Sequence, residues 1–172
     1  MKTPVLKYGL LSGAASAAMM LATVPFLDKL GFDNGAIFGY TAIVASFLFV
    51  FFGIKAYRDK ELGGAITFRR AMAAGLLMTV ISSLCYVVTW EFIYFKLTPD
   101  FSQKYSNYAV AKARAAGASA EDIAKTQQRM ADLTALLDQP LTNAAFTFVE
   151  PFPVGVLMTA VSAAILRKKP AA

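Results

Sequence analysis

The chain of 172 residues contains no histidine and only one cysteine, Cys85. Without histidine, Ser–His and Cys–His nucleophile pairs are excluded, and so are zinc or haem sites built on imidazole. A single cysteine also excludes a disulfide framework within the chain. The sequence therefore indicates no metal and no cofactor, and it favours a protein that is not an enzyme.

Charged residues are scarce as well. They make up 16% of the chain, against about a quarter in soluble domains. Hydrophobic residues make up 57%, and they are collected in four long blocks. One soluble core of this size cannot use four entirely apolar blocks without exposing some of them. The composition therefore predicts an all-α integral membrane protein, folded as a four-helix transmembrane bundle.

The four apolar blocks predict membrane spans at about 8–27, 36–54, 71–95 and 144–166. Some twenty apolar residues match the hydrocarbon thickness of a bilayer at about 1.5 Å per helical residue. A cleaved signal peptide is the alternative for the first block. Its apolar run continues past the small residues 13–18, which favours an uncleaved helix. A short turn at 28–35 is predicted between the first two spans.

The net charge of +6 is distributed unevenly along the chain. Segments 1–7, 55–70 and 167–172 hold ten Lys/Arg and two acids, whereas 28–35 and 96–143 hold seven Lys/Arg and seven acids. Basic loops are retained in the cytoplasm by the positive-inside rule. The pattern predicts that both termini and the 55–70 loop are cytoplasmic. It explains the basic balance without nucleic acid as a partner.

The long polar segment at 96–143 separates the third span from the fourth. Thr98 is predicted to cap a first helix that stops at Gly117. Ser119 is predicted to cap a second helix that ends at Pro140. The segment is therefore expected to form an extracytoplasmic helical hairpin.

Several local sequences carry a family resemblance: GIKAYRD at 53–59, Gly63-Gly64, TFRRA at 67–71, and Tyr86 followed by Trp90. Together they resemble an uncharacterised family of small bacterial inner-membrane proteins, known only as a domain of unknown function with four predicted transmembrane helices. The resemblance covers nearly the whole chain. It implies a multi-pass protein of the bacterial inner (cytoplasmic) membrane, and it supplies no catalytic residue and no substrate.

Two acids, Glu91 and Glu150, lie within predicted spans, where ionisable residues are functional-site hypotheses. Antiparallel helices are expected to place both at similar depth. Two interpretations remain open. In one, the acids form a polar or cation site with Tyr86 and the carbonyls freed by Pro151. In the other, each acid reaches water or a basic residue such as Lys96.

The basic loop also permits two interpretations. Arg58, Arg69 and Arg70 are candidates for contacts with lipid head groups. Alternatively, the loop only fixes the orientation in the membrane, since Gly63-Gly64 lacks the spacing of a phosphate-binding loop.

The sequence favours a non-enzymatic accessory or assembly factor of the bacterial inner membrane. Its expected partners are the lipid bilayer and either a second copy or another membrane protein. The alternative is a small transporter or ion-conducting subunit that uses Glu91 and Glu150 as paired carboxylates. A lipid-acting enzyme is least favoured, because no nucleophile–base pair is present.

Overall fold

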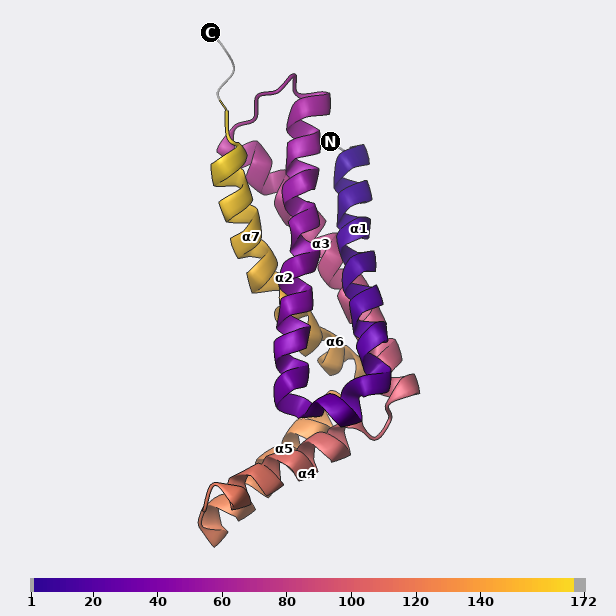
Figure 1. Ribbon diagram of the computed structural model, residues 1–172, viewed down its shortest axis with the longest axis vertical. Helices are drawn as coiled ribbons and strands as arrows, with labels where there is room; N and C mark the ends of the chain where they lie inside the picture. The colour runs from indigo at the N-terminus through magenta and orange to yellow at the C-terminus, as the bar shows by residue number, and fades with distance from the viewer. Residues whose placement is uncertain (1, 169–172) are drawn as a thin grey trace.

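The computed structural model describes residues 2–168, so Met1 and residues 169–172 of the basic C-terminal segment lie outside the described part. Figure 1 shows long upright helices side by side, with a helical hairpin at the end opposite to both termini. The upright helices are α1 (Lys2–Thr23), α2 (Leu27–Glu61), α3 (Phe68–Phe92) and α7 (Pro151–Leu166). The prediction of an all-α bundle is confirmed.

Shorter elements complete the chain. The 3₁₀ turn η1 (Val24–Phe26) joins α1 to α2, and the π-helical turn η2 (Ile93–Leu97) extends α3. The hairpin consists of α4 (Phe101–Ala115) and α5 (Ala120–Leu137), and α6 (Pro140–Val149) leads into α7. We call the end that carries this hairpin the hairpin end, and the opposite end, with the α2–α3 loop, the loop end.

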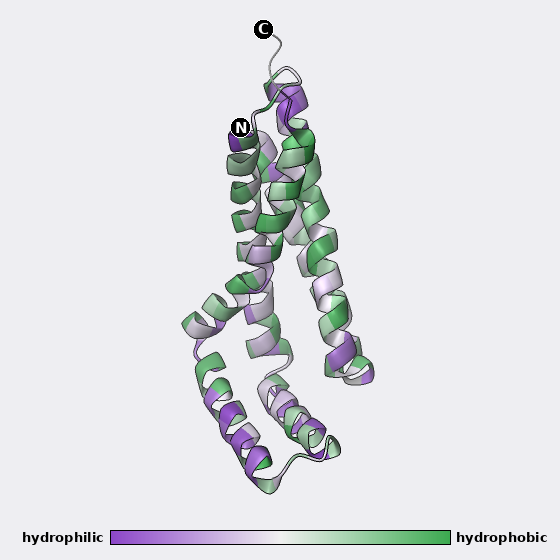
Figure 2. Cartoon of the chain, turned by 90° about the vertical axis from the view of Figure 1, so that its left-hand side faces the viewer, coloured by the Kyte–Doolittle hydropathy of each residue, from purple (hydrophilic) through white to green (hydrophobic). Residues whose placement is uncertain are grey.

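By length and composition, four segments can each cross a membrane: Thr3–Phe26, Lys29–Glu61, Phe68–Leu97 and Pro140–Leu166. The ribbon of the bundle has mostly the colour of hydrophobic residues in Figure 2, while the colour of hydrophilic residues is concentrated on the hairpin and at the loop end. The chain is therefore a membrane protein. Each segment is longer than the predicted span, because the helices continue into polar residues after the apolar run has ended.

The predicted turn at 28–35 is instead a kinked start of α2. The chain reverses earlier, at the 3₁₀ turn that contains Pro25. Gly31 then interrupts the helix with φ 68° and ψ 165°. This left-handed φ is accessible to glycine at little cost. Gly31 therefore bends a helix and does not form the predicted turn.

The central helix of the bundle is α3, which packs against α1, α2, α6 and α7. Small residues make these contacts close. A Cβ added to Gly75 would lie 2.5 Å from Cγ2 of Thr159, and one added to Gly13 would lie 2.5 Å from Cβ of Cys85. Close backbone approach of this kind is a main source of packing energy between membrane helices.

Buried hydroxyl groups add hydrogen bonds between the helices. Thr79 Oγ1 and Thr159 Oγ1 are 3.1 Å apart, which joins α3 to α7. The Ser12 hydroxyl lies 2.9 Å from Ser82 Oγ and donates to the Ser46 carbonyl. Interhelical bonds of this type contribute on the order of 0.6 kcal/mol each. Each of these bonds is therefore a small addition to the close packing of the helices.

Asn143 connects the base of the hairpin to α6 and is 1% exposed. Its Nδ2 donates to the Leu137 carbonyl at 2.9 Å, and its Oδ1 accepts from Thr147 Oγ1 at 3.1 Å. We expect Asn143→Ala to destabilise this junction by about 1–3 kcal/mol, because it leaves buried partners unpaired. Hydrogen exchange at the α5–α6 junction should be faster in Asn143→Ala than in the unmodified protein, whereas exchange in α1 should not change. Equal exchange at the junction in the two proteins would contradict this expectation.

Candidate functional site

The break between α6 and α7 lies at Glu150, Pro151 and Pro153. The α6 helix ends at Val149 and α7 begins at Pro151, with Glu150 between them in helical geometry. The Glu150 side chain forms no cap hydrogen bond to the backbone of α7. It is therefore available to a neighbouring helix.

Tyr86 of α3 meets Glu150. The tyrosine Oη donates to Glu150 Oε2 at 3.1 Å, and the Tyr86 residue is only 8% exposed. Glu150 itself is exposed at the surface of the bundle. The structure thus brings together two of the three predicted residues of the polar site.

Glu91 lies apart from this pair. It follows Tyr86 by five positions on α3, which is about 140° around the helix. Its Oε1 atom is buried without a hydrogen-bond partner, and within residues 2–168 no hydrogen bond or ion pair joins it to Glu150 or Lys96. Glu150 lies level with Tyr86, to which it bonds, and Glu91 lies five residues further along α3, which is about 7.5 Å nearer the hairpin end. The two acids are therefore offset along the bundle axis, whereas similar depths were expected.

The three arginines of the basic loop separate into two groups. Arg58 pairs with Asp59 at 2.7 Å and donates to the Leu166 carbonyl at 3.3 Å, so it satisfies the last turn of α7. Arg69 and Arg70 are exposed and line a shallow hollow of about 380 Å³ with Thr67 and Ala73. Arg69 and Arg70 are therefore the better placed for contact with a lipid head group.

At the opposite end, an aromatic cluster holds the hairpin against the start of α2. The Phe32 ring centroid lies 5.7 Å from Phe101, 5.3 Å from Tyr105 and 5.1 Å from Tyr108 of α4. Trp90 of α3 also contacts Phe101, at 5.1 Å. Aromatic pairs at such separations contribute beyond their buried area.

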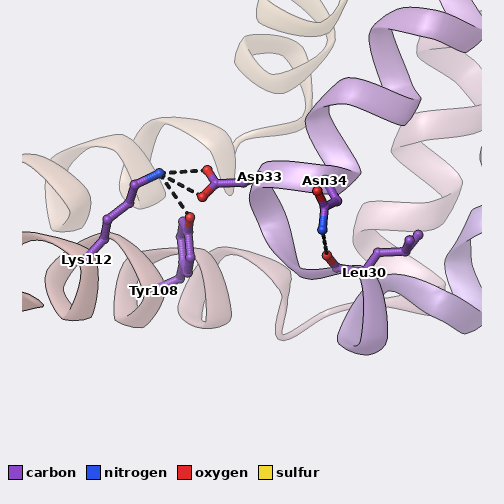
Figure 3. A network of polar contacts seen from close by, with 5 residues as sticks. All are labelled: Leu30, Asp33, Asn34, Tyr108 and Lys112. Atoms are coloured by element: carbon purple, nitrogen blue, oxygen red, sulfur yellow. Dashed lines mark hydrogen bonds and ion pairs between the residues drawn. The ribbon is translucent and has the colours of Figure 1, made fainter.

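An ion pair accompanies the aromatic cluster. Figure 3 shows Lys112 Nζ between the Asp33 carboxylate, at 2.7 and 2.9 Å, and Tyr108 Oη, at 3.2 Å. The hydrogen bond to Asp33 raises the pKa of Lys112 above its usual value. The pair is therefore present at neutral pH and is lost as the pH rises through that raised pKa. Both side chains are largely exposed, so its contribution to docking is small.

The hairpin has no buried residue in α4 or in α5. At its base, Tyr94 Oη donates to Asp138 Oδ1 at 3.0 Å. A groove of about 910 Å³ runs between the two helices, lined mainly by amide, hydroxyl and small side chains, with Arg114 and Asp138 as its charged members. The hairpin is therefore an arm without a core of its own, with a polar groove between its two helices.

Several of these residues were not predicted from the sequence. Phe32, Asp33 and Asn143 carry no motif, and only the folded chain brings them to their partners. Ser83 of α3, whose hydroxyl is buried without a hydrogen-bond partner, has a weak sequence signal, because it belongs to a series of hydroxyl residues at helical spacing with Thr79 and Tyr86. That series was visible in the sequence, but the helix it faces was not.

Comparison with known proteins gives one family match. The model of the family described as "Protein of unknown function (DUF4199)" matches residues 7–168. No curated protein and no solved structure matches the chain.

Proposed function

The chain belongs to the DUF4199 family, whose function is unknown, and we propose that it is a non-enzymatic accessory or assembly factor of the bacterial inner membrane. In this proposal the bundle holds the α4–α5 hairpin outside the cytoplasm, where its groove binds a polar segment of another membrane protein. The groove between α4 and α5 is the observation that carries the proposal.

The distribution of charge supports the proposed orientation. The loop end carries an excess of basic residues, whereas positive and negative residues balance on the hairpin side. By the positive-inside rule, the loop end and both termini are then cytoplasmic. Arg69 and Arg70 would face the anionic head groups of the inner leaflet.

The composition of the groove supports a polar partner. Arg114 lies near the tip of the hairpin and Asp138 near its base, with amide side chains such as Asn107 and Gln127 also lining the groove. A segment with an acid at one end and a base at the other complements this arrangement. The alternative, a transporter with paired carboxylates, has less support, because Glu150 bonds to Tyr86 and lies apart from Glu91.

Two adjacent glutamines give a matched test. Gln127 lines the groove, whereas Gln128 lies outside its lining and donates to Asp132 at 2.8 Å. We expect a photo-crosslinking residue at position 127, in living cells, to capture one membrane protein that position 128 does not capture. The capture should fall at least tenfold when Arg114→Glu and Asp138→Lys reverse the charges of the groove.

The proposal would be overturned if positions 127 and 128 gave the same crosslinked proteins in equal yield, or if the charge reversal did not change the crosslinking yield. Crosslinks between copies of this chain alone would show that the groove serves self-association and would likewise overturn it.

A further inference from the structure

The hydroxyl group of Ser83 is buried on α3 without a hydrogen-bond partner. The residue is 0% exposed. By comparison, Thr89 and Ser162 donate to the carbonyls of Cys85 and Met158 one turn earlier, and Ser12 donates across to the Ser46 carbonyl of α2. A fully buried hydroxyl without a partner lowers the stability of the folded protein. Such a group calls for an explanation, and a bound ligand is one.

The register of α3 against α7 shows what Ser83 faces. A Cβ at Gly75 would touch Thr159, and Thr79 bonds to Thr159 and to the Gly155 carbonyl. Ser83 lies eight residues after Gly75, and Pro151 lies eight residues before Thr159. In this antiparallel pair, Ser83 is therefore level with Pro151, which is itself buried.

Pro151 removes the usual helical donor of a second polar group at this level. Proline has no N–H, so the carbonyl of Thr147, four residues earlier, lacks its helical donor. Pro153 has the same effect on the carbonyl of Val149. A helical carbonyl points along the axis toward the residue four positions on, and the Thr147 carbonyl therefore points toward Pro151 and the level of Ser83.

The Glu150 carboxylate is the third component. It accepts from Tyr86 Oη at 3.1 Å, and no basic residue within residues 2–168 forms an ion pair with it. It lies about 15 Å along the axis from Pro140, near the middle of the fourth span. A carboxylate at that depth is costly without a compensating positive charge.

We propose that Glu150, Ser83, Tyr86 and the Thr147 carbonyl form a binding site for a monovalent cation, Na⁺ or K⁺. All four groups offer oxygen atoms, which are the ligands of hard cations. One carboxylate balances one positive charge. Carbonyls at an interrupted transmembrane helix are the groups that coordinate Na⁺ at the broken helices of secondary transporters. Glu91 is not part of this site.

The test is binding of ²²Na⁺ to the full-length protein in detergent, with competition by K⁺ or choline at constant ionic strength. We expect saturable binding that unlabelled NaCl or KCl displaces and choline chloride does not. Glu150→Gln should abolish binding, and Ser83→Ala should weaken it about tenfold, as expected for the loss of one ligand. Glu91→Gln is the matched control and should bind as the unmodified protein does.

The thermal unfolding midpoint provides a second readout in the same buffers. It should rise with Na⁺ or K⁺ in the unmodified protein and in Glu91→Gln, but not in Glu150→Gln. No saturable binding, or an equal rise in choline, would show that water or a proton satisfies these groups and would overturn the proposal. Loss of binding in Glu91→Gln as well would overturn the assignment of the site to Glu150.

Discussion

Replacing Gly155 with leucine is expected to disrupt the bundle more than any other single change at a helical glycine. A Cβ at this position would lie 2.4 Å from Thr79 Cγ2 and 2.7 Å from Phe47 Cζ. Neither neighbour can move easily: Phe47 is 1% exposed, and Thr79 is 0% exposed and branched at Cβ. We expect a loss of about 3 kcal/mol or more, at the upper end for overpacking.

The loss can be measured as a shift in the midpoint of SDS-induced unfolding in mixed micelles. Gly39→Leu is the matched control, because a Cβ at Gly39 meets nothing within 4 Å. The control should be neutral or slightly stabilising, since leucine forms helices better than glycine. Equal shifts in the two variants would mean that α3 and α7 do not pack as closely as described.

Removing the ring of Phe32 is expected to release the hairpin from the bundle. This ring contacts Phe101, Tyr105 and Tyr108, and each aromatic pair contributes about 0.5–1.5 kcal/mol beyond its area. For Phe32→Ala we therefore expect docking to weaken by about 2 kcal/mol, which corresponds to about a thirtyfold change in the docking equilibrium. Hydrogen exchange at the amides of α4 should accelerate accordingly, while α3 remains protected.

Trp90, the single tryptophan, reports the same event, because its ring contacts Phe101. Its fluorescence should shift to longer wavelength in Phe32→Ala. Phe38→Ala serves as the control, since Phe38 is exposed on α2 and makes no ring contact within the described residues. Asp33→Ala should have a small effect, because the Asp33–Lys112 pair is exposed. If Asp33→Ala released the hairpin as fully as Phe32→Ala, the aromatic cluster would not be what holds it.

Much of the architecture was predictable because long apolar runs and strong caps are local signals. The four spans follow from the length of the runs. The second hairpin helix follows from Ser119, whose Oγ accepts from the Asp122 N–H at 3.1 Å. Thr98 misled the prediction of the first helix. Its hydroxyl donates to the Ile93 carbonyl, and α4 begins only after Asp100.

The candidate site was less predictable, because it depends on which faces of the helices meet. Glu91 and Glu150 are equally conspicuous in the sequence as acids in apolar surroundings. Only the register of α3 against α6 and α7 shows that Tyr86 reaches Glu150, while Glu91 points elsewhere. An apolar stripe specifies that a helix is buried, but in a membrane bundle small residues such as Gly75 and Gly155 determine which neighbour comes closest.

The proposed role requires the hairpin and the basic loop to lie on opposite sides of the membrane, with the hairpin outside the cytoplasm. Single cysteines at Gln128, which is exposed and lies outside the groove lining, and at Lys60, in a Cys85→Ala background, test this directly with a membrane-impermeant maleimide. The account predicts that position 128 is labelled in intact spheroplasts and position 60 only after the membrane is permeabilised. Labelling of position 60 in intact spheroplasts, or protection of position 128, would contradict it.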